Sequence, residues 1–474
     1  MTADKIFGAI DKALVTIDGW VWGIPLILLI ILTGIYLTVR VRGLQVRHLG
    51  KALKFMVKNE EGGEGEVSSF GALCTALSAT IGTGNIVGVA TAIAAGGPGA
   101  LFWMIVAAFF GMATKYTEGF LAIKYRTIDE NGHVLGGPFY YIEKGMGAKW
   151  KWLAKLFAIF GVCAGLLGIG TITQINGISS AVQNFFDPQN AHIAFSIGEN
   201  SYSWAVVIIG IIVTACTALV VIGGIKRISN VSQVIVPFMA VLYVVFALSL
   251  IVCNITKVPG AIAEVVQGAF GLKAAAGGVL GAMIASMRNG VARGIFSNEA
   301  GLGSAPIASA AAKTNDTVRQ GLVSMTGTFI DTIVICTMTG LSIVIAGSWA
   351  KEGLAGVAIT TDAFTTGLPF PHAVSAFVLM ICLAFFAFTT ILGWDYYSER
   401  CLEYLSNRNQ TLVKIYRWVY VLAVFIGPYL TVSAVWTIAD IFNGLMAIPN
   451  VVALLALSGV VAKETSEYFK KLKK

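Results

Sequence analysis

The sequence predicts an all-α polytopic membrane protein, in which one extra helix precedes two five-helix halves of opposite orientation. Three observations predict it: the composition, eleven long apolar segments, and two interrupted segments at matching places. Of the 474 residues, 56% are hydrophobic and 12% are charged, against ~25% charged in an average soluble domain. The mean hydropathy is +0.78. A water-soluble surface cannot be built from this composition, whereas a membrane domain contacts lipid on its outer face.

Apolar segments of about 20 residues, the length that crosses a bilayer as a helix, occur eleven times. They are residues 20–39, 68–95, 99–123, 152–182, 204–222, 230–253, 258–290, 322–349, 372–394, 417–435 and 440–461. The first is not expected to be a cleaved signal peptide, because acidic residues precede it and basic residues follow it. We expect one integral membrane domain, with 20–39 as the extra helix, 68–253 and 258–461 as the halves, and 462–474 as a basic tail.

The basic residues predict the orientation of the chain. If residues 40–58 face the cytoplasm, eleven spans place the N-terminus outside and the C-terminus inside, and 27 of the 33 Lys and Arg residues then fall in cytoplasmic segments. These segments are residues 40–58, 124–155, 226–227, 288–319, 400–417 and 463–474. Because the charges cluster at the ends of apolar segments, they indicate topology and not a nucleic-acid partner. The seven cysteines show no C-x-x-C spacing, so neither a metal site nor a disulfide framework is expected.

The second span is interrupted near its middle. Residues 78–88 read Ser-Ala-Thr-Ile-Gly-Thr-Gly-Asn-Ile-Val-Gly, and each glycine weakens a helix. A break frees backbone groups, which are tolerated at membrane depth only where they face protein or a water-filled site. Carbonyls before the break can bind a cation, and amides after it can hold a carboxylate. The alternative is a continuous helix in which Gly84 and Gly88 form a packing face.

A second interruption is predicted at residues 271–278, within the span 258–290. Each interrupted span is followed by four uninterrupted ones, which gives two halves of five spans. Because five is odd, the second half must enter the membrane in the opposite orientation. Paired broken helices in an inverted repeat mark the binding site of secondary transporters. The alternative is coincidence in a chain with 53 glycines.

Few ionisable side chains lie at membrane depth. Lys115 and Glu118 are one helical turn apart, and we expect them to form a structural ion pair. Asp331 is a candidate functional carboxylate, with a hydrogen-bonded structural role as the alternative. The four histidines lie in loops or at a span edge, so a proton-coupled mechanism would have to use carboxylates.

Two further polar stretches are candidates for binding. Thr389 and Thr390 follow Phe386 in the ninth span, and neighbouring hydroxyls can add oxygen ligands that suit an alkali cation. The alternative is that each threonine bonds back to its own helix. Gln174 carries a large amide that needs partners in an apolar span, either on a substrate or on a neighbouring helix. No nucleophile–base group, P-loop or metal-ligand cluster is evident, so we expect neither an enzyme nor an ATP-driven pump.

Three motifs resemble the alanine/glycine:cation symporter family, also called the sodium:alanine symporters. They are Gly-Thr-Gly-Asn at residues 82–85, Gly-Gly-Pro-Gly-Ala-Leu-Phe-Trp-Met at 96–104, and Arg-Gly-Ile-Phe-Ser-Asn-Glu-Ala-Gly at 293–301. The similarity extends over nearly the whole chain, although Ile105 replaces the usual tryptophan. The resemblance implies the leucine-transporter fold, which is a five-plus-five inverted repeat, here after an extra helix. It also implies a sodium-coupled carrier of alanine or glycine, in a prokaryotic inner membrane, with no oligomer required.

The resemblance further implies site residues. A sodium ion is expected between the first and eighth core helices. Its ligands would be the carbonyls of Ser78, Ile81 and Phe386 and the hydroxyls of Thr389 and Thr390. The substrate residues would be Thr83, Gly84, Asn85, Gln174, Phe270 and Gly271. Residues 293–301 are expected in a cytoplasmic loop with a gating or packing role.

Two alternatives to sodium symport follow from the sequence. One is the same fold coupled to protons, with Asp331 or Glu118 as the carrier. The other, from a different class, is a channel or a receptor that does not transport. Uptake driven by separate sodium and pH gradients distinguishes the first alternative, and substrate counterflow distinguishes the second.

Overall fold

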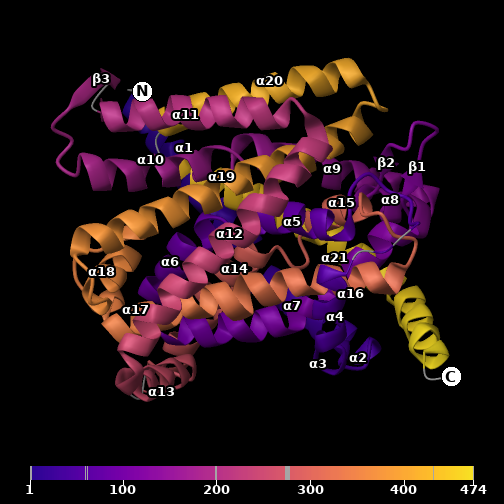
Figure 1. Cartoon of the computed structure of the whole chain (residues 1–474), viewed down its shortest axis with the longest axis horizontal. Helices are drawn as coiled ribbons and strands as arrows, with labels where there is room; N and C mark the ends of the chain where they lie inside the picture. Colours follow the sequence, from indigo (N-terminus) through magenta and orange to yellow (C-terminus); the bar gives the residue numbers. More distant parts are fainter. Residues whose placement is uncertain are drawn as a thin grey trace.

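The computed structural model describes residues 3–58, 60, 62–197, 200–272, 278–430 and 432–472, and these are mostly helical. The long helices run side by side along the long axis of the molecule (Figure 1). Helices α13 (Val258–Ala269), α17 (Thr337–Ala346) and α18 (Val357–Gly367) gather at one end of this axis. The hairpin of β1 (Thr127–Ile128) and β2 (Val134–Leu135) lies at the other end, as does the end of α21 (Val432–Lys471). We call this second end the basic face, because residues 40–58, 124–155, 400–417 and 463–472 contribute most of its loops and helix ends.

The remaining elements follow the predicted order of spans. Their bounds are α1 Ala3–Val21, α2 Ile24–Arg40, α3 Leu44–Arg47, α4 Leu49–Val57, α5 Ser69–Thr80, η1 Gly84–Gly88, α6 Val89–Gly96, α7 Gly99–Lys124, α8 Pro138–Tyr140, η2 Tyr141–Gly145, η3 Ala148–Trp150, α9 Lys151–Leu167, α10 Ile172–Phe186, β3 Ile193–Ile197, β4 Asn200–Ser203, α11 Trp204–Val221, α12 Gly224–Cys253, η4 Ile255–Lys257, α14 Val279–Asn298, α15 Ala305–Ala310, α16 Thr317–Thr328, η5 Phe329–Cys336, η6 Ser348–Ala350, α19 His372–Leu405, α20 Gln410–Ile426 and η7 Gly427–Tyr429.

Within the described part of the chain, nine helices are long and apolar enough to cross a membrane, and a bent pair, Ser69–Thr80 with Gly84–Gly96, makes a tenth. Ten of the eleven predicted spans correspond to these helices, and the span predicted at 258–290 does not. Two spans are longer than expected: α19 runs to Leu405, and α21 continues through Lys471, so the predicted tail is helical as far as Lys471.

Helix α7 lies at the centre of the packing, with α14, α16 and α2 against it. Small residues make these approaches close. A Cβ added at Gly290 would lie 2.1 Å from the Ala100 carbonyl oxygen, and one added at Gly99 would lie 2.1 Å from the Ala269 nitrogen. Backbone therefore packs on backbone at both positions, and only glycine fits there.

The second helix break differs from its predicted place. Of the predicted break at 271–278, residues 273–277 lie outside the described residues. The break that faces the first one separates α14 from α15, at residues 299–304. Glu299, Gly301 and Gly303 have φ angles of +55°, +91° and +84° there, and left-handed backbone ends a helix. The motif 293–301 therefore does not form a loop after a span but completes α14 and enters this break.

Candidate functional site

The first break opens between α5 and η1. The two halves of this helix meet at an angle of 52°, so the alternative of a continuous packing helix is wrong. Side chains bind two of the freed amides: Gly82 N donates to Asn85 Oδ1 at 2.9 Å, and Thr83 N donates to Gln174 Oε1 at 3.2 Å. The break is thus held open by one local side chain and one from α10.

Asp331 connects the two breaks. Its Oδ1 accepts a hydrogen bond from Asn85 Nδ2 at 2.7 Å, and its Oδ2 accepts from Ser297 Oγ at 2.9 Å and from Thr332 Oγ1 at 2.7 Å. Asn85 belongs to the first break, and Ser297 lies two residues before the second. The breaks also touch directly, because a Cβ added at Gly84 would lie 3.4 Å from the Ser297 Cα. Asp331 is fully buried in the π-helical turn η5.

Glu299 organises the interior of the second break. Its Oε1 accepts from Trp394 Nε1 of α19 at 2.8 Å, and its Oε2 accepts from Ser304 Oγ at 2.6 Å. The side chain is almost completely buried. This carboxylate therefore spans the break and attaches it to α19. Sequence reasoning missed Glu299 as a site residue, although the flanking Gly301 and Gly303 were a signal that the chain turns there.

The predicted Lys115–Glu118 ion pair does not form. Glu118 Oε1 instead accepts from Gly301 N at 3.1 Å and from Asn450 Nδ2 at 2.7 Å. Asn450 also donates to the Gly301 carbonyl at 2.9 Å. Among the described residues, Lys115 Nζ has no hydrogen-bond partner, and it lines a cavity of about 10 Å³ beside Thr80. Glu118 therefore accepts a hydrogen bond from a backbone amide that the second break leaves free.

Oxygen atoms gather where α5 approaches α19. Thr390 Oγ1 lies 3.4 Å from the Ile81 carbonyl oxygen and 3.0 Å from that of Phe386. Thr389 Oγ1 also lies 3.0 Å from the Phe386 oxygen, and it contacts Met239 Sδ on α12 at 3.5 Å. Both threonines bond back to their own helix, as the alternative predicted, yet they do so beside the first break. Carbonyl and hydroxyl oxygens of this kind suit an alkali cation.

Ser78 lies one turn before Ile81, and its Oγ donates to the Thr75 carbonyl at 2.7 Å. Its backbone belongs to the last turn of α5, whose carbonyls point toward the break. Gly82 is the point of closest approach, since an added Cβ would lie 2.4 Å from Thr390 Oγ1. The structure thus brings the predicted cation residues to the α5–α19 contact.

Four of the predicted substrate residues also meet. Thr83 is the N-cap of η1, Gly84 and Asn85 begin it, and Gln174 contacts Thr83 from α10. Gln174 Nε2 donates to the Ile169 carbonyl at 3.0 Å, in the interruption between α9 and α10. Thr83 Oγ1 is buried without a hydrogen-bond partner in the described structure. A buried hydroxyl without a partner is costly, so this group is available to a bound ligand.

Phe270 and Gly271 are not part of this site. The Phe270 ring packs on Phe102 and Trp103 at the start of α7, with ring centroids 5.4 and 6.2 Å away, and 41% of the residue is exposed. Its neighbourhood lies beyond the far end of α6, whose eight residues span ~12 Å. The prediction placed both residues at a break because the apolar run 258–269 resembles half a span.

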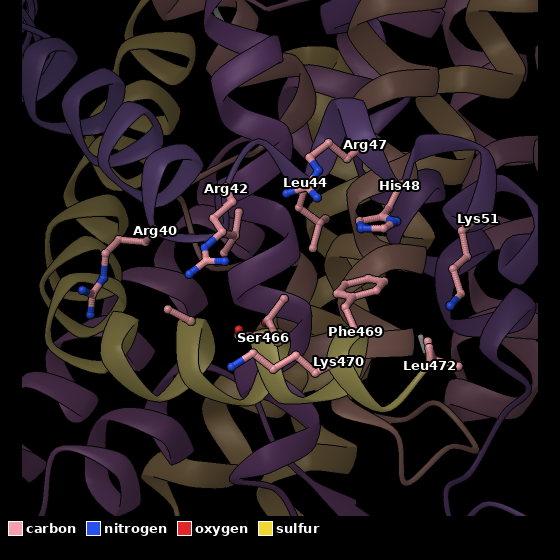
Figure 2. A pocket seen from close by; sticks show the side chains of 13 residues that line it. Arg40, Arg42, Leu44, Arg47, His48, Lys51, Ser466, Phe469, Lys470 and Leu472 are labelled. Atoms are coloured by element: carbon pink, nitrogen blue, oxygen red, sulfur yellow. The ribbon is translucent and has the colours of Figure 1, made fainter. Parts of the chain in front are cut away.

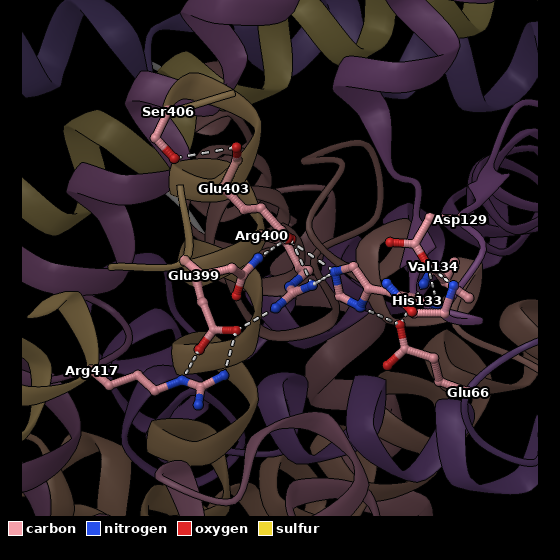
Figure 3. Close-up of polar contacts among 11 residues, drawn as sticks. Glu66, Asp129, His133, Val134, Glu399, Arg400, Glu403, Ser406 and Arg417 are labelled. Atoms are coloured by element: carbon pink, nitrogen blue, oxygen red, sulfur yellow. Dashed lines mark hydrogen bonds and ion pairs between the residues drawn. The ribbon is translucent and has the colours of Figure 1, made fainter. Parts of the chain in front are cut away.

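A network of ion pairs links three segments on the basic face (Figure 3). His133, in the β1–β2 turn, bonds through Nδ1 to Glu66 Oε1 and through Nε2 to Glu403 Oε1, each at 3.0 Å. Arg400 Nη1 contacts Glu403 Oε2 at 2.6 Å, and Arg400 also pairs with Glu399. Glu66 lies before α5 and Glu403 lies in the last turn of α19, so this network joins the two helices that flank the oxygen cluster.

Arg126 links further segments on the basic face. Its guanidinium donates to the carbonyls of Ala310 and Ala312 at 2.6 Å, of Thr314 at 2.7 Å and of Glu64 at 2.8 Å. Ala310 ends α15, so Arg126 satisfies carbonyls that the helix end leaves free. The segment before α5 lies alongside, where Lys313 N donates to the Val67 carbonyl at 2.7 Å.

The His133 network predicts a pH dependence. Hydrogen bonds to Glu403 and then to Glu66 raise the pKa of His133 from 6.5 to about 9, against burial and the nearby Arg400. Because the folded pKa is above the unfolded value, the stabilisation by protonated His133 is complete below pH 6.5 and is lost as the pH rises through about 9. Thermal unfolding midpoints across this range should fall in wild type and fall less in His133→Gln. His192→Gln, in the loop between α10 and α11, should keep the wild-type profile; equal profiles for all three proteins would contradict the assignment.

The fold and the paired helix breaks define a polytopic membrane protein of the transporter class. The sequence pattern of the sodium:alanine symporter family matches residues 8–474, and the chain therefore belongs to this family. It is 46% identical over 462 residues to the sodium/alanine symporter AgcS of Methanococcus maripaludis, with 96% of each chain covered. It is 38% identical over 453 residues to the probable sodium/glutamine symporter GlnT of Bacillus subtilis, with 95% of this chain and 89% of that one covered.

Among solved structures, MhsT in complex with L-phenylalanine resembles this one with a TM-score of 0.55 at 14% sequence identity. The match covers 85% of this chain and 100% of MhsT. At this identity the likeness shows the fold, which is the leucine-transporter fold. The predicted family membership and the predicted fold of an integral membrane protein are thus confirmed.

Proposed function

We propose that this protein carries a small neutral amino acid, alanine or glycine, into the cell together with sodium. The observation that carries the proposal is the pair of helix breaks, which Asp331 joins beside the oxygen cluster of Ile81, Phe386 and Thr390. The AgcS relative, named as a sodium/alanine symporter, supports alanine. GlnT, named as a probable sodium/glutamine symporter, makes glutamine the substrate to test against it.

Sodium would bind between α5 and α19. The carbonyls of Ser78, Ile81 and Phe386 and the hydroxyls of Thr389 and Thr390 would be its ligands. Each hydroxyl now donates its hydrogen to the Phe386 carbonyl, which leaves lone pairs on the hydroxyl oxygens for a cation. A positive ion here would hold the two helices together, since both contribute its ligands.

The amino acid would bind next to the break itself. Thr83, Gly84, Asn85 and Gln174 would hold it, with the positive start of η1 facing its carboxylate. The unpartnered hydroxyl of Thr83 supports this assignment, and Ser297 joins the set from the second break. Ion and substrate would favour each other, because both require the same open break, and this coupling is reciprocal.

The membrane topology is also a proposal. The broken pair α14–α15 would bring the number of membrane spans from ten to eleven. The N-terminus would then lie outside and the basic face in the cytoplasm, with the chain in the inner cell membrane. The chain begins and ends at opposite ends of the molecule (Figure 1), which supports an odd number of spans. Arg293 bonds to Asp440 at 3.2 Å in a cavity that Asp18 also lines. Because Asp18 precedes the first span, on the proposed outer side, Arg293 would also lie in the outer half of the membrane. It would therefore not belong to the predicted cytoplasmic segment 288–319.

Alternating access would open the two faces in turn. The His133 network and Arg126 link segments on the basic face, and release of the substrate into the cell would require these contacts to break. One positive charge that moves inward across 100 mV supplies ~2.3 kcal/mol, or about fifty-fold accumulation. The sodium gradient adds to that driving force.

The test is uptake of labelled alanine into proteoliposomes with sodium and pH gradients imposed separately. A sodium gradient alone should drive accumulation, and a pH gradient alone should not. Unlabelled alanine inside should accelerate entry of labelled alanine, as a carrier requires and a channel does not. Unlabelled glycine should compete better than glutamine. If a pH gradient without sodium drove the accumulation of labelled alanine, the sodium proposal would be wrong and proton symport would take its place. Buried Asp331 is the candidate proton carrier in that case.

A further inference from the structure

A basic cavity of about 300 Å³ lies between the end of α2 and the end of α21 (Figure 2). Five cationic side chains line it, and no acidic side chain of the described residues does. They are Arg40, Arg42, Arg47, Lys51 and Lys470. Figure 2 shows the arginines on the α2 and α3 side and Lys470 on the α21 side, with the cavity between them. The charges therefore come from segments more than 400 residues apart and meet at one place.

Ion pairs neutralise several cations elsewhere on the basic face. Lys124 pairs with Glu464 at 2.5 Å, Lys151 pairs with Glu143 at 3.0 Å, and Arg417 pairs with Glu399. In the part of the chain that the structure describes, no carboxylate forms an ion pair with any of the five cavity cations. Several unpaired positive charges around one hollow repel each other, so an anion that enters it is stabilised by all of them.

The cavity is built into the fold. The chain reverses direction after α2 through Arg42 and Gly43, whose φ angles are +58° and +62°. A left-handed arginine is uncommon and costs energy. His48 and Lys51, which follow α3, contact the α21 side: the rings of His48 and Phe469 stack with centroids 3.9 Å apart, and Lys51 Nζ lies 5.3 Å from the Phe469 ring centroid. These contacts position the cations around the hollow.

The surface beside the cavity is apolar. Arg40 is the last residue of α2, and the outward face of that helix carries Leu32, Tyr36 and Val39, which are 58%, 42% and 71% exposed. Their spacing places them on one stripe of the helix, and the stripe leads directly to the cavity. A free phosphate would use only the charges, whereas a phospholipid would use both the charges and the stripe.

We propose that this cavity binds the phosphodiester headgroup of an anionic membrane lipid, with an acyl chain along the outer face of α2. Arg42 and Arg47 contact the phosphate from one side, and Lys470 contacts it from the other. Basic pockets between membrane helices on the cytoplasmic side are suited to such headgroups. A bound lipid joins α2 to α21 and so stabilises the contact between the extra helix and the last helix.

The test measures lipid binding to the detergent-solubilised full chain by native mass spectrometry and by the thermal unfolding midpoint. The probes are dioleoylphosphatidylglycerol, dioleoylphosphatidylcholine and inorganic phosphate. Phosphatidylglycerol should bind and raise the midpoint, while the other two should do neither. The double variant Arg42→Gln with Arg47→Gln should bind phosphatidylglycerol about ten-fold more weakly or worse. Arg42→Lys with Arg47→Lys, which keeps the charge, should retain most of the binding.

The matched control is Lys149→Gln with Lys155→Gln, which removes two exposed cations at the start of α9, outside the cavity. This variant should bind lipid as wild type does. Equal losses in the control and in the cavity variant would show diffuse attraction and would overturn the proposal. An effect of inorganic phosphate equal to that of the lipid would identify a free-anion site instead. If the cavity variant does not fold, the three probes on wild type still decide, since no preference for phosphatidylglycerol would overturn the proposal.

Discussion

Asp331→Asn is expected to lower sodium-driven alanine uptake at least ten-fold while the protein remains folded. The carboxylate accepts hydrogen bonds from Asn85, Ser297 and Thr332, and each hydrogen bond to a charged group contributes ~1.5–3 kcal/mol. An asparagine would keep the size of the side chain, but its NH₂ group would replace one of the two carboxylate oxygens that accept these hydrogen bonds. One of the two breaks would then lose its connection to the other.

The measurement is the initial uptake rate per reconstituted protein, alongside the unfolding midpoint. Asp187→Asn is the matched control, because that carboxylate is also buried and accepts hydrogen bonds, from Ala191 N and His192 N, in the loop after α10. It should transport as wild type does. If Asp331→Asn keeps normal uptake, the connection between the breaks is not needed for transport. If it loses only a response to pH, the carboxylate acts as a proton carrier.

Gly82→Ala is expected to raise the sodium concentration for half-maximal uptake about ten-fold or more. The new methyl would lie 2.4 Å from Thr390 Oγ1 and 3.2 Å from Gln174 Oε1. Overpacking of this kind costs ~1–3 kcal/mol, and the added atoms would separate the first break from α19. The proposed sodium ligands from the two helices would no longer be close enough to share an ion.

Gly88→Ala is the matched control, since this glycine ends the π-helical turn η1 just after the break and an added Cβ meets nothing within 4 Å. It should leave the sodium dependence unchanged. Adding Thr390→Ala to Gly82→Ala removes the hydroxyl that the methyl meets. This double variant should recover packing and thermal stability but not the sodium dependence. Full recovery of both would show that Thr390 is a packing residue and not a ligand.

The first break and its surroundings could be predicted from the sequence for a simple reason. Glycine, threonine and asparagine interrupt an otherwise apolar segment at 78–88, and unpaired backbone is not tolerated in lipid. The hydroxyls of Thr389 and Thr390 were informative in the same way. These patterns are local in the sequence, so they can be recognised without knowing which helices are neighbours.

Gly301 and Gly303 indicate a turn, but the sequence does not identify it as the second break, because the stability of that break comes from distant partners. Arg288, Arg293 and Glu299 make 279–304 too polar to resemble a membrane span. In the structure, Trp394 of α19 satisfies Glu299, and Asn450 of α21 shares Glu118 with Gly301. The same partners explain why the one-turn spacing of Lys115 and Glu118 predicted an ion pair that does not form.

The contacts of Arg126 bear on how the protein moves. One guanidinium holds the carbonyls that end α15 and the carbonyl of Glu64 before α5, and Val67 pairs with the strand-like segment at Ala312. The end of α15 and the segment before α5 are therefore held together by direct contacts. We expect these two segments to move together about the breaks, so that the basic face opens in one cooperative step. Cross-linking either segment to its surroundings should then immobilise the other.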